Sequence, residues 1–137
     1  MANYVPNIAE QLLLDVLIAE ELDSAELRLF VANHTPVAGD VAATYLAIEA
    51  AFGGYAPQTL NSWTPAAINA GGAAETEETV RTFLATGAGL PETVFGVFVL
   101  DLAGDLVYAD KFATGGITLA AAGQTVSYLP KFTLSTT

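Results

Sequence analysis

The chain has 137 residues, of which 53% are apolar and only 14% charged, with fifteen acidic residues, four basic residues, one histidine and no cysteine. A net charge of −11 disfavours binding to nucleic-acid phosphates and to anionic membranes. The lack of cysteine excludes disulfides, thiolate nucleophiles and cysteine metal sites, and the length fits one domain. No positively charged leader of a secretory signal is visible, and no apolar run is long enough to cross a bilayer.

The first predicted element is a helix over residues 8–22. Asn7 is suited to cap this helix, Glu10 occupies a capping-box position, and Pro6 precedes the cap. Apolar residues spread over nearly all faces of the helix, which predicts a buried helix. They are Ile8, Leu12, Leu13, Leu14, Val16, Leu17, Ile18 and Ala19. The helix either packs on the sheet of its own chain or forms an arm that packs partly on a neighbouring subunit.

Short apolar runs with a period of two residues follow the helix and are separated by turn residues. The predicted strands are 27–33, 45–51, 55–63, 80–85, 93–100, 106–112, 117–119 and 125–134. Residues 66–79 are predicted to form a long, exposed, acidic loop, with 71–79 on the solvent side. Residues 101–105, with Gly104, form the turn of a predicted hairpin. Pro130 lacks an N–H donor, so strand 125–134 is expected at a sheet edge or with a bulge.

These elements predict a mainly β fold, an antiparallel β-sandwich or jelly roll of about 7–8 strands with an N-terminal α-helix. Residues 1–25 are predicted to form a helical arm and residues 26–137 the β-sandwich domain. Strand 93–100 is apolar on both faces, and Phe95 and Val97 lie on one of them. Both faces must be covered, which suggests that the helix covers one and a neighbouring chain part of the other.

Residues that could perform chemistry are sparse. His34 is the only imidazole, and it lies in neither a clustered metal-ligand motif nor a G-x-S-x-G nucleophile motif, so it is interpreted as a turn residue. A carboxylate pair could hydrolyse glycosides, but no aromatic sugar cleft is evident. Asp101 and Asp105 could offer oxygens to Ca²⁺, although a solvated turn is the simpler interpretation. The sequence therefore predicts no enzyme and no cofactor.

Two aromatic residues, Tyr55 and Trp63, have two interpretations. As an exposed pair they could grip a sugar or anchor an interface, whereas Trp63 could equally be an ordinary core residue of a sandwich. Tyr55 follows Gly53 and Gly54, which favours a position near the surface. Together with the apolar helix residues, Tyr55, Trp63, Phe95 and Val97 are the candidate interface residues.

Five segments between Leu27 and Leu134 carry a resemblance to a known group of proteins. They are Leu27–Pro36 (LRLFVANHTP), Phe52–Ala56 (FGGYA), Trp63–Ala66 (WTPA), Val94–Asp101 (VFGVFVLD) and Gly123–Leu134 with its leading glycine turn. In order and character these segments resemble small virion structural proteins of tailed bacteriophages. The resemblance implies a jelly-roll-like module that decorates the capsid or builds part of the tail or fibre, and it implies no catalytic residues.

The expected function is therefore that of a phage virion protein that decorates or cements the outer capsid. Expected partners are further copies of the chain, as a dimer or trimer, and the major capsid protein or other virion proteins, without nucleic acid or membrane. The helix and the strand end at Trp63 are the expected contact regions. The alternative is a tail-fibre or receptor-binding module that uses the loops 35–44 and 66–79.

Overall fold

The structure is a computed structural model that describes residues 7–134 of the chain. It is mainly β, with antiparallel sheets and an N-terminal helix, as the sequence predicts. The helical elements are α1 (Asn7–Leu17), the π-helical turn η1 (Ile18–Leu22) and α2 (Ala42–Leu46). The strands are β1 (Ala25–Phe30), β2 (Gln58–Leu60), β3 (Ala67–Ile68), β4 (Ala74–Glu77), β5 (Arg81–Leu84), β6 (Glu92–Val94), β7 (Gly96–Leu100), β8 (Leu106–Lys111), β9 (Ile117–Leu119), β10 (Thr125–Tyr128) and β11 (Lys131–Leu134).

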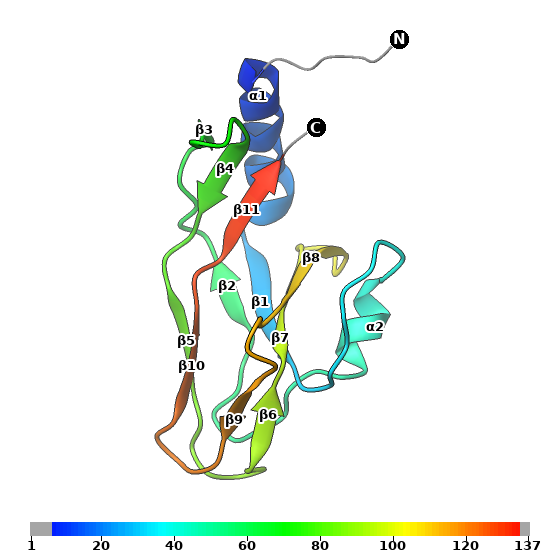
Figure 1. Ribbon diagram of the computed structural model, residues 1–137, viewed down its shortest axis with the longest axis vertical. Coiled ribbons are helices and arrows are strands. Elements are labelled where there is room, and N and C mark those ends of the chain that lie inside the picture. The colour runs from blue at the N-terminus through cyan, green and yellow to red at the C-terminus, as the bar shows by residue number, and fades with distance from the viewer. Residues whose placement is uncertain (1–6, 135–137) are drawn as a thin grey trace.

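The strands form four antiparallel groups arranged along an elongated molecule (Figure 1). The largest sheet has the order β2-β1-β7-β8, and the others are β10-β5, β11-β4-β3 and β6-β9. Helix α1 lies at one end beside β3, β4 and β11, and the β6-β9 pair lies at the other end. The predicted hairpin is confirmed, because β7 and β8 pair across the 101–105 turn.

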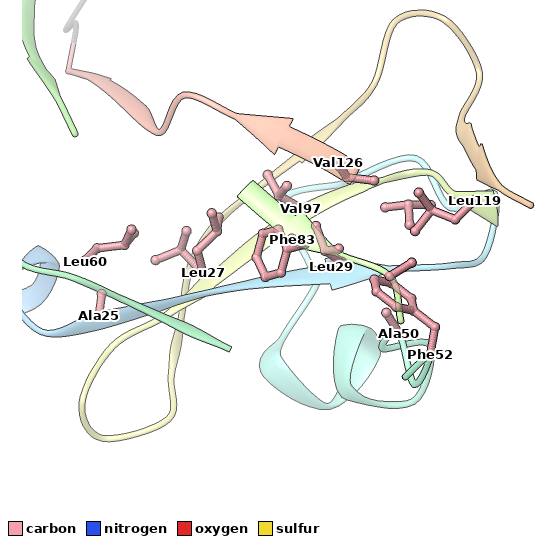
Figure 2. Close-up of a cluster of buried hydrophobic side chains, with 13 residues drawn as sticks. Ala25, Leu27, Leu29, Ala50, Phe52, Leu60, Phe83, Val97, Leu119 and Val126 are labelled. Carbon is pink, nitrogen blue, oxygen red and sulfur yellow. The ribbon is translucent and has the colours of Figure 1, made fainter. Parts of the chain in front are cut away.

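The main core lies between the four-stranded sheet and the β10-β5 ribbon (Figure 2). Leu27, Leu29 and Val97 project from one side of this core towards Phe83 and Val126 on the other. These side chains are almost completely buried. Alternate residues of β1 therefore point into one layer, as the two-residue period of a strand requires.

Strand β7 is apolar on both faces, and the chain itself covers both. Val97 and Val99 face the main core, whereas Phe98 and Leu100 belong to a second buried cluster with Phe30 and Tyr45. All five residues of β7 are buried. The expectation that a neighbouring chain covers part of this strand was wrong, because the segment that contains α2 folds over the second face.

Tyr45, predicted in a strand over residues 45–51, instead lies in helix α2. The Asp40 carboxylate accepts hydrogen bonds from Tyr45 Oη at 2.8 Å and from the Val37 N–H at 3.0 Å, and it contacts His34 Nε2 at 2.8 Å. These contacts turn the chain back towards the sheet and place the Tyr45 ring against Phe98. Only a single bridge between Phe30 and Glu49 remains of the predicted strand.

The prediction of an exposed loop over residues 66–79 was also wrong. The segment contains β3 and β4, and β4 pairs with β11. Ala74 and Thr76 are buried, and the buried Glu78 carboxylate forms an ion pair with Arg81 at 3.1 Å. Glu75 is paired with Lys131 at 3.1 Å. The acidic residues that indicated a hydrated loop are instead paired with Lys131 of the neighbouring strand β11 and with Arg81, which follows Glu78 by three residues.

Two further strands differ from their predicted bounds. The predicted strand 93–100 is divided at Phe95, so that β6 pairs with β9 while β7 pairs with β1 and β8. Within the predicted strand 55–63, only β2 pairs with a neighbour. The prediction for Pro130 is confirmed, because it separates β10 from β11 and β11 lies at the edge of its sheet.

Candidate interaction surface

Helix α1 packs on the chain with one of its faces. Leu14 is fully buried and forms a cluster with Ala66 and Ala74. Leu17 and Ile18 are partly buried against the same cluster. Glu10 is buried as well. The inward face therefore rests on the β11-β4-β3 sheet and is not available to a partner.

The outward face of α1 carries four large apolar residues in solvent. They are Ile8, Leu12, Leu13 and Val16, with exposed fractions between 55% and 69%. The prediction that the helix is buried all round was wrong, because a sheet lies on only one side of it. We call these four residues the α1 apolar face.

Three hydrogen bonds hold α1 and η1 to the body of the protein. Gln11 Nε2 donates to the Ala66 carbonyl at 2.9 Å, and the Ala66 N–H donates to Asp15 Oδ1 at 2.9 Å. The Trp63 indole N–H donates to the Leu22 carbonyl at 2.9 Å. Together with the packing of Leu14, these bonds fix the α1 apolar face in one orientation, so a partner meets a preformed surface. The arm predicted over residues 1–25 is thus packed on its own chain where it is described, and residues 1–6, including Pro6, lie outside the described residues.

Leucines on the two faces of α1 are expected to respond very differently to truncation. Replacing the buried Leu14 by alanine removes core contacts and leaves a cavity, so we expect Leu14→Ala to lower the free energy of unfolding by roughly 2–4 kcal/mol. Leu12→Ala should change it by less than about 0.5 kcal/mol, since this side chain contacts mainly water. Urea unfolding followed by circular dichroism measures both. Equal losses in the two variants would contradict this packing, and a larger loss in Leu12→Ala would show that the helix packs through the other face.

An acidic hollow lies between η1, which follows α1 directly, and the β7–β8 turn. The hollow has a volume of about 430 Å³ and is lined by Glu20, Glu21, Asp101, Leu102, Ala103 and Asp105. The pKa of Glu21 is raised, first by a hydrogen bond between its carboxyl group and Asp101 and then by desolvation. None of the lining residues is basic, so the negative charge of this hollow is not compensated by its own lining.

The remaining interface candidates pack against the cores of their own chain. Tyr55 is partly buried; its hydroxyl donates to Glu49 Oε1 at 2.6 Å and accepts from the Leu29 N–H at 3.2 Å, while its ring stacks on Phe83. Burial and the bond to Glu49 raise the pKa of Tyr55. Tyr55 is thus partly buried at the edge of the main core, and its hydroxyl group is already hydrogen-bonded within the chain.

Trp63, Phe95 and Val97 are likewise engaged within the chain. Trp63 is half-buried against the main core and bonds η1, and Phe95 packs against the second cluster. Val97 is fully buried. No side-chain surface of Leu14 or Val97 remains to contact another molecule.

A second exposed apolar group was not foreseen from the sequence. Val37, Val41 and Leu46, in the 35–44 loop and in α2, are all exposed. We call them the α2 apolar patch. The sequence indicated the loop through its proline and glycine. It did not indicate which side chains would be exposed: Tyr45 packs into the second buried cluster, and Val37, Val41 and Leu46 are left in solvent.

The groups that could perform chemistry are used to hold the structure together. His34 contacts only the Asp40 carboxylate among the acidic groups and packs edge-on against the Tyr45 ring at 5.5 Å. Asp101 Oδ1 accepts the Asp105 N–H at 2.8 Å within the β7–β8 turn. Within residues 7–134 no group of three or more histidine or acidic side chains is placed to hold a metal ion. Over the same range, no helix is both long enough and apolar enough to cross a membrane.

The Asp40 carboxyl group gives the protein a measurable dependence on pH. Its pKa is lowered, chiefly by the hydrogen bond with His34 and then by the Val37 N–H. A carboxyl group with a lowered folded pKa contributes stability above its unfolded pKa and loses it as the pH falls through the folded value. We therefore expect the thermal midpoint to fall between about pH 5 and about pH 2.5.

The variant Asp40→Asn isolates this contribution. It should melt at a lower temperature than the unaltered chain at pH 7, and its melting temperature should drop less on acidification, because one carboxyl group with a lowered pKa has been removed. Part of the drop should remain, because Glu75 and Asp101, whose pKa values are also lowered, still titrate. Thermal unfolding followed by circular dichroism is the measurement. An equal drop in both proteins would contradict a role for Asp40 in the acid response.

Comparisons with known proteins do not identify the chain: no protein-family model, no curated protein and no solved structure matches it.

Proposed function

We propose that the protein is a structural component of a phage virion that decorates or cements the outside of the capsid and has no enzymatic step. The observation that carries this proposal is the α1 apolar face, a rigid helical surface with four large apolar side chains in solvent. Exposed apolar groups of this kind mark sites of protein–protein contact. The resemblance between Leu27 and Leu134 to small tailed-phage virion proteins supplies the biological setting.

The energetics of the α1 apolar face suit a protein that binds in many copies. Burying each of its four side chains contributes roughly 1–2 kcal/mol, since each is already partly covered. The sum is comparable to the roughly 4 kcal/mol or more that association costs in lost freedom of motion. A single copy therefore binds weakly through this face alone, and a dimer or trimer of the chain that engages several equivalent sites of a symmetric shell at once would bind more tightly.

The proposal includes a β-sandwich of jelly-roll type as the body of the module. Two features support two layers: the main core is shared by the four-stranded sheet and the β10-β5 ribbon, and β1 pairs with β7 across a long crossover. Non-consecutive neighbours of this kind are typical of Greek-key and jelly-roll connections.

The test is the copy number of the chain in purified virions, measured by quantitative mass spectrometry. Decoration of the capsid predicts hundreds of copies per particle, in a fixed ratio to the major capsid protein. Particles that lack the chain should take it up when purified protein is added. Absence of the chain from purified particles would overturn the proposal.

Variants connect this test to the structure. The double variant Leu12→Ser/Leu13→Ser should fold but fail to bind the particles, because it removes half of the α1 apolar face. His34→Ala should bind them normally, since the proposal assigns this residue no chemistry. The dimer or trimer that the proposal includes is measured separately, as the mass of the free protein by light scattering.

A tail-fibre or receptor-binding module is the second candidate, and the α2 apolar patch favours it. The 35–44 loop and α2, which carry the exposed Val37, Val41 and Leu46, lie on one side of the molecule, away from α1 (Figure 1). A handful of copies per particle would favour this function over decoration. Loss of host adsorption in a Val37→Ser/Val41→Ser variant that is still incorporated into particles would establish it.

A further inference from the structure

We propose that the α1 apolar face docks into an apolar groove bordered by lysine or arginine on a different protein, and not onto a second copy of this chain. This inference rests on the proposed function, because it specifies the partner chemistry of the same surface. It follows from the shape of the face, from the negative charge near it, and from the fact that most basic residues of the chain are already paired with its own carboxylates.

The shape of the face fits recognition of a helix by a groove. Ile8, Leu12 and Val16 are spaced four residues apart, so they form one row along the exposed side of α1, with Leu13 beside them. Such rows are the anchors of helices that lie in apolar grooves. The inward face is held by Leu14 and by the bonds to Ala66, so the helix offers this row without having to unfold or turn.

The charge beside the row is uniformly negative. The segment from Asn7 to Asp23 contains no basic residue and five acidic residues, of which all but the buried Glu10 lie at least partly in solvent. At its C-terminal end, Glu20 and Glu21 share the acidic hollow with Asp101 and Asp105 of the β7–β8 turn. The raised pKa of Glu21 reflects its contact with Asp101, which an incoming cation would relieve. A partner with lysine or arginine at the rim of its groove complements this arrangement.

A second copy of the chain cannot supply that positive charge. Only four residues of the chain are basic, and three of them are already bound to carboxylates within their own copy: Arg28, Arg81 and Lys131. The fourth, Lys111, donates to Thr35 at 3.2 Å and lies on β8, outside the α1 end. Two copies that met through α1 would bring together two acidic segments, each on a chain of net charge −11. Any dimer or trimer of the chain is therefore expected to use another surface.

The experiment uses the full chain and two helical peptide probes with the same leucine pattern. One probe has lysine at every polar position and the other has glutamate. The leucine–lysine peptide should bind, with a dissociation constant that rises about tenfold or more between low salt and about 0.3 M NaCl, because salt screens the rim charges. The leucine–glutamate peptide should bind at least about tenfold more weakly. Equal binding of both peptides would overturn the proposal.

Matched variants separate docking on α1 from general attraction between charges. Leu12→Ser/Leu13→Ser leaves the charge unchanged and should weaken binding of the leucine–lysine peptide about tenfold or more, whereas Val37→Ser/Val41→Ser on the α2 apolar patch should not. Glu20→Gln/Glu21→Gln should weaken binding and reduce its salt dependence. Unchanged binding by Leu12→Ser/Leu13→Ser would overturn docking on the α1 apolar face. Circular dichroism and thermal melting establish that each variant is folded.

Two further measurements assign the face to another occupant if the proposal is wrong. A mass by light scattering that falls from oligomer to monomer in Leu12→Ser/Leu13→Ser would show that a second copy covers it. Cosedimentation with phosphatidylcholine vesicles that the same variant abolishes would show that a lipid surface does. Failure of the proposed virion function has a different signature, namely absence of the chain from purified particles, and it would leave the peptide results unchanged.

Discussion

The variant Gly96→Ala should fail to reach the native fold or should be less stable by at least about 3 kcal/mol, the largest effect that we expect from a single methyl group in this protein. A Cβ atom at Gly96 would overlap the Asp110 backbone oxygen and lie only 2.6 Å from the Phe30 ring. Neither neighbour can move easily, because Asp110 is held in β8 and the Phe30 ring is buried between Tyr45 and β7. Urea unfolding at neutral pH measures the loss.

Gly104 provides the matched control for this prediction. It lies in the β7–β8 turn with open space around the position of a Cβ atom, although its φ of +89° disfavours any other residue. Gly104→Ala should therefore lose only about 1 kcal/mol from backbone strain. If Gly96→Ala were as stable as Gly104→Ala, the close approach of β7, β8 and Phe30 would not exist in solution.

The second large effect is expected from Phe98→Ala, with a loss of roughly 3–5 kcal/mol in the free energy of unfolding. Phe98 is fully buried on the outer face of β7, where its ring stacks on Tyr45 with the ring centres 5.3 Å apart. Truncation would leave a cavity under α2 and remove the contact that holds this segment on the sheet. The conservative variant Phe98→Leu should lose less than about 2 kcal/mol.

This prediction tests whether the chain covers both faces of its own central sheet. If a neighbouring copy covered the Phe98 face instead, Phe98→Ala would alter the oligomeric mass more than the stability of the single chain. Leu102→Ala is the control, since its side chain is 85% exposed in the β7–β8 turn and its loss should be smaller than about 0.5 kcal/mol. A comparable loss at both positions would contradict burial of Phe98 within the chain.

Much of the local structure could be predicted from the sequence. The helix after Asn7, the hairpin around Gly104, the strand at residues 117–119 and the interruption at Pro130 are all present. Each of these features depends only on residues close together in the sequence. They are a run of helix-forming residues, a turn that contains glycine, an alternation of apolar and polar residues, and a proline that lacks an N–H donor. The mainly β character with antiparallel pairing follows from the same local patterns.

The misplaced elements share a different cause. Tyr45 was assigned to a strand and the acidic residues near Glu75 to a loop, because their local patterns carry no information about distant partners. Asp40 turns the Tyr45 segment into a helix that covers β7, Lys131 comes from β11, which pairs with the acidic strand β4, and Arg81 reaches Glu78 from three residues further along the chain. These contacts join residues that are far apart in the sequence or depend on a loop conformation, so composition and periodicity cannot reveal them.

The candidate surface shows the same division. By itself, the sequence determined that the chain is rich in apolar residues and poor in charged ones, that this apolar excess lies in the first helix and in strand 93–100, and that few groups could perform chemistry. Only the tertiary structure decided where the uncovered area lies. Strand β7 of the central sheet is covered on both faces by its own chain, while the single sheet beside α1 can bury only one side of a helix that is apolar nearly all round, so Ile8, Leu12, Leu13 and Val16 remain in solvent.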